Sequence, residues 1–442
     1  MTHPKFTSLG GMKRLVKNED GGTTAFGIFI CAVVIGFGGL AIDVTNVIQE
    51  RTRLQIAGDA AAHAALVARE SKTEAEAKAL ALDVAAAILP NGAFGDALNV
   101  NDIQFGQYNS ATKGFTVDPG ANDAVLVSTQ RLAERSNSVG AMFLQFVGHA
   151  SFDIRTRSVF ETYMPTCLRE GFVAEDVVDV STSNEYQAGF CIHSNTHIDA
   201  QNDNYYHDGV IVSMPDMRDA VMPTAGWTSN IGLPQALRDG AYQLRIINRI
   251  TDIIAGVQDP TSTYYRDYIT DPTPLTFSNS VKVDDVWQPG RIHVFTCSNP
   301  KKKLNINTNA TIDSGVIVTN CIFSMPQGVT MTNVMIASEN EENPAIDMAS
   351  GFTLGDDDNC SPGGGSQIVT LGGVKLAADV SFYGSQILAA QEIQFTSNAL
   401  GIEGVSLVSG EGIIGTSNSN IGFCGGAGLE DNFEAWYFRM AG

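Results

Sequence analysis

The chain has 442 residues, which is enough for about three domains of ordinary size and for a large hydrophobic core. It carries 27 Lys and Arg against 48 Asp and Glu, and the resulting net charge of −21 repels phosphates and excludes nucleic acid as a partner. Hydrophobic residues make up 44% and exclude a disordered chain, while 44 glycines favour turn-rich β structure over a helical bundle.

The first predicted element is a transmembrane helix at residues 21–42. No charged residue lies between Asp20 and Asp43, and as a helix this segment spans roughly 33 Å, the thickness of a bilayer core. Residues 1–20 form a basic tail, which the positive-inside rule keeps in the cytoplasm while the rest of the chain is exported. A cleaved signal peptide is the alternative, because Gly39–Leu40–Ala41 offers small residues to a peptidase. We favour an uncleaved single-pass anchor, since the helical pattern continues beyond the span.

That continuing helix is amphipathic. Apolar residues recur at three- and four-residue steps on one face, opposite charged side chains. The apolar face consists of Leu54, Ala57, Ala60, Ala61, Ala64, Ala65 and Ala68. A seam of small side chains admits a partner helix at close range or packs on the chain's own sheet, and the sequence leaves both possibilities open.

The same region carries a longer motif. It begins with Asp20–Gly21–Gly22, crosses the apolar span to Asp43 and continues through Arg51 to Ala65. The motif positions that we single out are Asp43, Leu54, Gln55, Asp59, Ala60 and Ala61. This pattern resembles the N-terminal region of TadE/TadG-like proteins of the bacterial Tad (Flp) pilus-assembly machinery, closely over residues 15–70.

The resemblance implies a single-pass protein of the bacterial inner membrane, with its bulk in the periplasm or exposed at the surface. Its implied partners are the inner membrane and other Tad/Flp pilus-assembly proteins or pilin-like subunits, and it implies no cofactor. Family members that are processed as prepilins place a Glu five residues after the cleaved Gly. Gly27 stands at that position counted from Gly22, which argues against incorporation as an ordinary pilin.

Residues 43–163 are predicted to form a TadG-like helix-plus-sheet domain. Thr73 and Glu76 match a capping box that starts a second helix, and Pro90 stops that helix after Leu89. Alternating apolar residues predict strands at 102–108, 124–130 and 152–159, with a short helix at 139–147. The prediction is an α+β, pilin-like unit behind a long membrane-anchored helix.

Residues 164–442 are predicted to form a mostly-β domain. Short apolar pairs recur every five to eight residues, and three such steps make a coil of about 20 residues, as in a parallel β-solenoid (β-helix). Examples are Val374/Leu376, Val380/Phe382, Ile393/Phe395 and Val405/Leu407. A β-sandwich is the alternative, but its strands usually recur at about 8–12 residues. Apolar spacing from Gln235 to Ala255 adds a helical insertion at about 233–256, packing on the solenoid or covering its end.

Six of the seven cysteines follow the membrane span, which itself contains Cys31. They are Cys167, Cys191, Cys297, Cys321, Cys360 and Cys424. An even number in an oxidising compartment predicts three disulfides, with free buried thiols as the alternative. Neighbour pairing joins Cys167 to Cys191 and Cys297 to Cys321, each pair 24 residues apart, about one solenoid coil.

Three polar clusters have both a chemical and a plain interpretation. Asp179–Ser183 matches the Asp-x-Ser-x-Ser pattern of metal-ion-dependent adhesion sites, although a polar turn fits the surrounding sequence better. Asp356–Asn359 offers calcium ligands or paired acids, but adjacent acids in a Gly-rich turn are usually only solvated. The third cluster would share one strand face, as metal ligands or as an ordinary polar surface, and consists of His193, Asn195, His197 and Asp199. We predict no catalytic, cofactor-binding or metal-binding residue.

The sequence therefore predicts a membrane-anchored, non-enzymatic component of a Tad/Flp-type pilus-assembly or secretion apparatus, with a pilin-like or TadG-like structural role. The alternative is an anchored extracytoplasmic β-solenoid adhesin or glycan-binding protein, and a polysaccharide-active enzyme ranks below both. Clustered aromatic and acidic groups on one solenoid face would favour these alternatives. The dense aromatic pairs after the anchor are Tyr205–Tyr206 and Tyr264–Tyr265.

Overall fold

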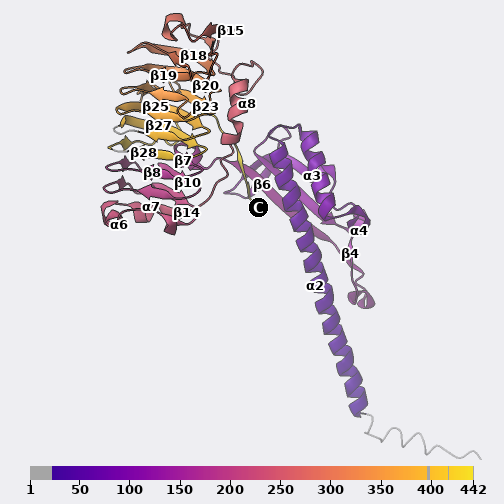
Figure 1. Ribbon diagram of the computed structural model, residues 1–442. Helices are drawn as coiled ribbons and strands as arrows, with labels where there is room; N and C mark the ends of the chain where they lie inside the picture. Colours follow the sequence, from indigo (N-terminus) through magenta and orange to yellow (C-terminus); the bar gives the residue numbers. More distant parts are fainter. Residues whose placement is uncertain (1–21, 396–398, 417, 442) are drawn as a thin grey trace, which may run out of the picture. The chain divides into compact units, whose positions relative to one another are not determined.

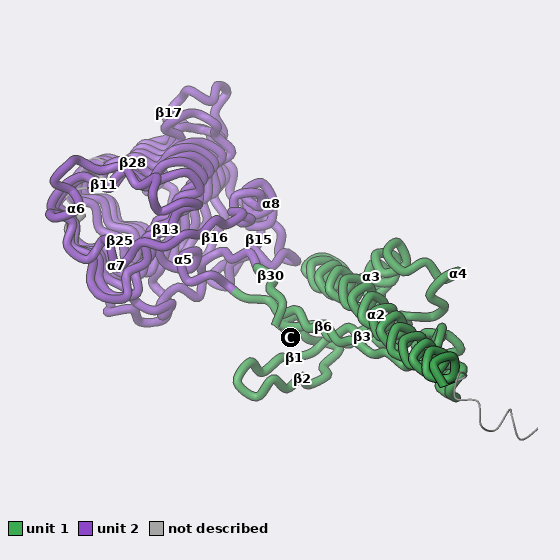
Figure 2. The backbone as a smooth tube through the Cα atoms, turned by 90° about the horizontal axis from the view of Figure 1, so that it is seen from below, with its two compact units in different colours: residues 1–163, 437–442 green, residues 164–436 purple. Residues whose placement is uncertain are grey.

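The computed structural model describes residues 22–395, 399–416 and 418–441 (Figure 1). The chain divides into two compact units: unit 1 spans residues 1–163 and 437–442, and unit 2 spans residues 164–436 (Figure 2). The predicted cytoplasmic tail, residues 1–20, lies outside the described residues. The chain thus leaves unit 1, builds the whole of unit 2 and returns to unit 1 for its last strand.

Unit 1 consists of helices packed on an antiparallel sheet. Helix α2 (Gly22–Ala68) runs without a break from the apolar span into the folded unit, and α3 (Glu74–Ile88) follows it. The predicted capping box is present: the Thr73 side chain accepts the N–H of Glu76, and the Glu76 carboxylate accepts the N–H of Thr73 at 3.0 Å. A single turn, α4 (Asn91–Phe94), leads into the sheet. The sheet order is β2 (Gly114–Val117), β1 (Ile103–Asn109), β3 (Ala124–Arg131), β6 (Ile154–Tyr163) and β30 (Tyr437–Met440).

The alanine face of α2 is buried inside this unit. Leu54, Ala57, Ala61 and Ala65 have no exposed surface, whereas Ala60 is partly exposed. The residues that share a core with the C-terminal alanines of α2 come from α3, β1 and β3: Ala77, Ala81, Ala85, Ile103, Phe105, Val125 and Val127. Of the two possibilities left open by the sequence, intramolecular packing is the one observed, so this seam is not free to receive a partner helix.

The predicted helix at 139–147 is wrong. These residues begin a hairpin formed by β4 (Val139–Gly140) and β5 (Ser151–Phe152), with a 3₁₀ turn, η4 (Leu144–Val147), near its tip. The N–H of Ala141 donates to the carbonyl of Ala150 at 2.9 Å, which extends the strand pairing toward the turn. Gly148 follows η4 with φ of +94°, a left-handed conformation that ends the helical turn.

Unit 2 is a parallel β-solenoid with two main sheets (Figure 1). The larger sheet follows the order β14 (Leu237–Asp239), β13 (Ile211–Met214), β10 (Cys191–Ser194), β7 (Gly171–Ala174), β27 (Ala399–Ser409), β25 (Val380–Ala389), β22 (Thr353–Leu354), β20 (Thr330–Ser338), β18 (Thr311–Thr319), β16 (Arg291–Thr296) and β15 (Asp271–Ser278). Attached to it are β23 (Gln367–Thr370), β9 (Glu185–Tyr186), β12 (Tyr205–Tyr206) and β29 (Asn420–Ile421). The smaller sheet follows the order β11 (Ile198–Ala200), β8 (Val178–Val180), β28 (Ile413–Thr416), β26 (Ile393–Phe395), β24 (Val374–Leu376), β21 (Ile346–Met348), β19 (Ile322–Met325) and β17 (Lys303–Asn305).

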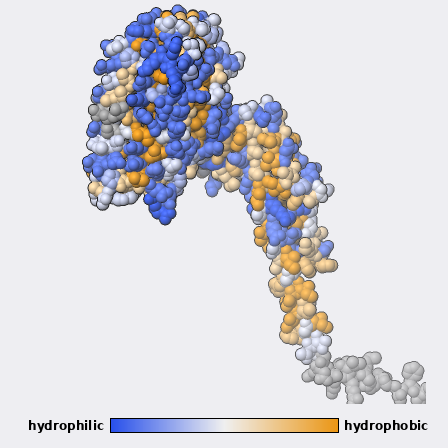
Figure 3. Space-filling model, in the orientation of Figure 1, coloured by the Kyte–Doolittle hydropathy of each residue, from blue (hydrophilic) through white to orange (hydrophobic). Residues whose placement is uncertain are grey.

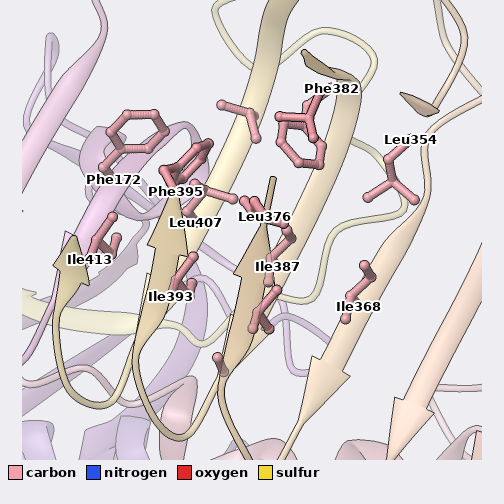
Figure 4. Close-up of a cluster of buried hydrophobic side chains, with 14 of the residues drawn as sticks. Phe172, Leu354, Ile368, Leu376, Phe382, Ile387, Ile393, Phe395, Leu407 and Ile413 are labelled. Atoms are coloured by element: carbon pink, nitrogen blue, oxygen red, sulfur yellow. The ribbon is translucent and has the colours of Figure 1, made fainter. Parts of the chain in front are cut away.

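The strand register explains the short apolar repeat in the sequence. Paired residues of adjacent coils are about 20 positions apart in the sequence. Ile192 pairs with Val212, 20 positions later, and Val374 pairs with Ile393, 19 positions later. The predicted coil length of about 20 residues and the solenoid are therefore confirmed. Inward-pointing apolar side chains stack from coil to coil and fill the space between the sheets (Figure 4).

The coils are not stacked in chain order. Strand β7, the first of the unit, pairs with β10 on one side and with β27 near the C-terminus on the other. The chain therefore starts in the middle of the stack, builds outward to β14, crosses to the far end and returns from β15 to β27. Figure 1 shows this as magenta coils lying directly beside yellow ones. Short helices occur before β7, at α5 (Thr166–Arg169), and before β14, at α6 (Gly226–Ser229) and α7 (Leu233–Ala236).

The predicted helix from Gln235 to Ala255 is broken up in the structure. Residues 237–239 form β14, which pairs with β13 as a further rung, and helix resumes only at η6 (Ile247–Arg249) and α8 (Ile250–Gly256). The physical reason is that Leu237 gains a sheet partner in Val212, and this pairing overrides the helical spacing of the apolar residues. Helix α8 contacts β20 and β23, so it packs on the larger sheet during the crossover.

Candidate functional site

Helix α2 has two halves with different surroundings. In its N-terminal half large apolar side chains are exposed, among them Phe26 at 63%, Phe29 at 69% and Phe37 at 71%. Among the described residues, α2 is the one helix long and apolar enough to cross a membrane, and only 6% of its most apolar window is buried. A core helix of a soluble protein would bury that surface. Figure 3 shows the continuous hydrophobic surface along this half.

Asp43 stands where the apolar span ends and ties α2 to the β4–β5 hairpin. Its carboxylate is 1% exposed and accepts three backbone N–H groups, from Met142 at 2.7 Å, Phe143 at 3.0 Å and Leu144 at 2.7 Å. Gly39, one turn earlier, is equally constrained, since a Cβ at this position would lie 2.6 Å from the Cβ of Phe143. Asp43 thus caps η4 from a different element of the fold.

Most of the other motif residues lie at the seam between α2 and the sheet, whereas Ala60 is partly exposed. The carbonyl of Leu54 accepts the hydroxyl of Thr129 at 2.9 Å, and the Gln55 amide donates to Asp59 at 2.7 Å and to the carbonyl of Arg157 at 3.2 Å. Ala61 is fully buried. These residues attach the helix to β3 and β6, so their role in this chain is to join the anchor firmly to unit 1.

Sequence reasoning missed a further attachment at Glu50. Its carboxylate lies 2.6 Å from a guanidinium nitrogen of Arg131 on β3 and 3.1 Å from one of Arg53, and both Glu50 and Arg131 are largely buried. The available signal was a charged residue between the apolar span and the alanine face of α2, but its partner Arg131 is 81 positions away. The pair fixes the helix at the point where it enters the folded unit.

Unit 2 contains three disulfides. They join Cys167 to Cys191, Cys297 to Cys321, and Cys360 to Cys424, while Cys31 in the apolar span is unpaired. The first two have the neighbour pairing expected from their separation. Each links adjacent coils, because Cys191 starts β10 beside β7, and Cys297 and Cys321 follow the paired strands β16 and β18.

Glu170 links the beginning of the solenoid to its end. It is 1% exposed, and its carboxylate accepts the N–H groups of Cys424 at 2.6 Å and Gly426 at 3.2 Å. Burial raises the pKa of Glu170 above its ordinary value of 4.5, although these backbone donors oppose the change. The folded state therefore holds the proton more tightly than the unfolded state does.

This raised pKa predicts a pH dependence. The stability that protonated Glu170 contributes should be complete below pH 4.5 and lost as the pH rises through its folded-state pKa. We expect the melting temperature of the wild type to fall relative to that of Glu170→Gln as the pH is raised above 4.5. Glu411→Gln, at an exposed position, is the control for the removal of one carboxylate from unit 2. A constant difference between wild type and Glu170→Gln would contradict the assignment.

The first two of the three polar clusters identified in the sequence contact neighbouring residues of the solenoid. Asp179 lies on β8 beside Asp199, and burial together with that neighbouring carboxylate raises the pKa of Asp179. Asp356 accepts the Thr332 hydroxyl at 3.0 Å, and Asp358 accepts the N–H of Ser361 at 2.9 Å, so the acidic run forms a polar turn.

The third cluster is not on one strand face. His193 lies on β10 and Asp199 on β11, with a turn between them. His193 contacts Ser213 at 2.8 Å and Asn195 at 2.9 Å, and burial lowers its pKa. Asn195 donates in turn to Glu175 at 2.7 Å and to the carbonyl of Tyr242 at 2.6 Å. These polar groups hold the start of the crossover segment against the sheet.

Metal binding finds little support in the described ranges. One group there has suitable spacing, formed by Cys360, Glu403 and Cys424, but the two cysteines share a disulfide and cannot act as thiolates.

Sequence reasoning also missed an asparagine ladder. Asn184, Asn204 and Asn230 are each 1% exposed, and the amide of Asn204 bonds to Asn184 and to Asn230, each at 3.0 Å. The 20-residue spacing of the first two was the available signal.

Comparison with known proteins gives two family matches. Residues 21–74, which cover α2 and the start of α3, match the family described as "Putative Flp pilus-assembly TadE/G-like". Residues 171–425, nearly all of the solenoid, match the family described as "Domain of unknown function (DUF7867)". A search of curated proteins finds no match. The chain therefore belongs to the DUF7867 family, and it carries a TadE/G-like N-terminal domain in front of the matched solenoid region.

Proposed function

We propose that the protein is a membrane-anchored, non-enzymatic structural component of a Tad/Flp-type pilus-assembly or secretion apparatus. The observation that carries the proposal is the continuity of α2. Its exposed apolar half is long enough to cross a bilayer, and the same helix enters the core of unit 1 without a break. An anchor built this way holds the folded unit at the membrane surface rather than on a flexible tether.

The proposed location is the bacterial inner membrane, crossed once, with residues 1–20 in the cytoplasm and the bulk in the periplasm or at the surface. The basic tail supports this orientation through the positive-inside rule. Three disulfides support an oxidising compartment for unit 2. The TadE/G-like match supports other pilus-assembly proteins as partners.

The non-enzymatic role is supported by the surroundings of the candidate polar groups. His193, Asn195 and the Asp356–Asp358 run all make hydrogen bonds that hold turns or segments in place. One of the two aromatic pairs considered for glycan binding, Tyr205–Tyr206, is also divided, because Tyr206 is 2% exposed and stacks on Tyr186 at 5.1 Å inside the core. Only Tyr205 of that pair faces solvent, at 40% exposure.

Alkaline carbonate extraction and N-terminal sequencing of the full-length chain test the anchor. We expect the protein to stay in the membrane pellet with residues 22–42 retained. Val33→Asp/Val34→Asp should release it, since each charge in the middle of a span costs about 2.5–3.5 kcal/mol on insertion scales. His63→Asp/Ala64→Asp, on the same helix beyond the span, is the matched control for added charge and should still pellet. A soluble wild-type protein that begins near Ile42 would refute the proposal.

Orientation needs a separate measurement. In a Cys31→Ser background we expect an impermeant maleimide to label Ala111→Cys on intact spheroplasts, because Ala111 is an exposed turn residue of unit 1. Lys5→Cys should become labelled only after lysis. The reverse pattern would overturn the proposed topology while leaving the anchor itself in place.

A further inference from the structure

The tip of the β4–β5 hairpin exposes an unusual set of side chains. We call residues 141–150 the apolar loop. Within it Phe146 is 83% exposed, Val147 77% and Met142 54%, and Phe143 is exposed at 37%. No Asp, Glu, Lys or Arg occurs from residue 136 to residue 152. Large apolar groups that protrude from an uncharged loop are costly in water and call for a covering partner.

The position of the loop along α2 identifies that partner. Asp43 holds the backbone of residues 142–144, and Phe143 packs on Gly39, so the loop lies beside helix residues 39–43. At a rise of about 1.5 Å per residue, Asp43 is about 32 Å along the helix from Gly22, close to the thickness of a hydrocarbon core of about 30 Å. The loop is therefore level with the outer boundary of the proposed span.

The loop also continues an apolar surface of the helix. Leu40, Ile42 and Val44, which neighbour Gly39 and Asp43 along the helix, are 40%, 47% and 44% exposed. In Figure 1 the β4 hairpin runs alongside α2 from the sheet toward the N-terminal half of the helix. The loop and the end of the span together form one apolar surface. In the membrane this surface would contact lipid at a single depth.

We infer that the apolar loop inserts Phe146 and Val147 into the outer leaflet of the bilayer, next to the transmembrane helix. The occupant of this surface is lipid, and the inference rests on the proposed function because it requires α2 to span the membrane. The chain then has two points of membrane contact, held together by Asp43. Two contacts restrict the tilt of unit 1 relative to the bilayer, which a single helix leaves freer.

Site-directed spin labelling of the full-length chain tests this in phosphatidylcholine vesicles, whose neutral surface isolates apolar insertion from charge. In a Cys31→Ser background with the three disulfides intact, single labels are placed at Phe146→Cys and Val147→Cys. Ile30→Cys, on the exposed part of the span, is the lipid control, and Ala111→Cys is the water control. Collision rates with oxygen and with a water-soluble nickel chelate report the surroundings of each label.

We expect labels at 146 and 147 to resemble the label at 30, with high oxygen and low chelate accessibility, and to differ from the label at 111. If position 30 is in lipid while 146 and 147 are in water, the loop inference fails and the anchor stands. If position 30 is in water, the proposed function fails and the inference with it. If 146 and 147 are shielded from both reagents, protein rather than lipid covers the loop, and the inference is wrong.

Discussion

Ile393→Asp should destabilise unit 2 by at least about 4 kcal/mol, because it removes a buried aliphatic side chain and places a carboxyl group in the space between the sheets. Ile393 has no exposed surface and pairs with Val374 and Ile413 of the adjacent coils. Figure 4 shows Ile393 next to Ile413 among the inward-pointing side chains. In urea unfolding of the detergent-solubilised chain, we expect the transition of unit 2 to move to a much lower concentration, and limited proteolysis to cut within the solenoid.

The next residue on the same strand provides the matched control. Gln394 pairs with Lys375, which in turn pairs with Asp347, and Gln394 is partly exposed. A carboxylate is therefore already present at this outward position two coils away. Gln394→Asp should change stability by less than about 1 kcal/mol. Equal effects of the two substitutions would show that the inward and outward registers are assigned incorrectly.

Loss of a single disulfide should cost about 3–4 kcal/mol in the chain-entropy account, less any strain that the bridge introduces. Cys297→Ala/Cys321→Ala removes a bridge across 24 residues, and Cys360→Ala/Cys424→Ala one across 64. Both double variants should unfold at lower urea concentration than the wild type. Cys31→Ser is the control and should leave the stability of unit 2 unchanged, since Cys31 is unpaired.

Non-reducing peptide mapping checks the pairing itself, and mild reduction checks access. Cys191 and Cys321 have no exposed surface, whereas Cys360 and Cys424 are partly exposed. A small water-soluble thiol should therefore reduce the Cys360–Cys424 bridge first. A link between Cys167 and Cys297 would contradict the coil-neighbour arrangement, and six free thiols in freshly exported protein would contradict the oxidising compartment.

Local patterns made much of this fold predictable. An uncharged run of bilayer length predicts the span, Thr73 and Glu76 predict the start of α3, and apolar pairs at a coil length of about 20 residues predict the solenoid. The pairing of Cys167 with Cys191 and of Cys297 with Cys321 followed from the same length, because cysteines about one coil apart are stacked by the register. In each case the physical cause acts over a few residues or over one repeat.

The remaining features depend on contacts between distant residues. Leu144–Val147 has an apolar composition that also suits a helix, and only the carboxylate of Asp43, about a hundred positions earlier, shows why it is a turn at the tip of a hairpin. Leu237 fits a helical pattern in the sequence, but in the structure it pairs with Val212 as part of a parallel strand. His193 and Asp199 alternate as on one strand, but the chain turns between them to reach the other sheet.

The order of the coils has a consequence for the time course of folding. Phe172 on the first coil pairs with Leu407 on the last, 235 positions later, and β6 of unit 1 likewise receives β30 from the C-terminus. During export both β7 and β6 therefore present unpaired edges until the end of the chain emerges, and contacts of such long range form slowly. A chain that stops short is left with two open sheet edges at once, and misassociation or proteolysis is its expected fate.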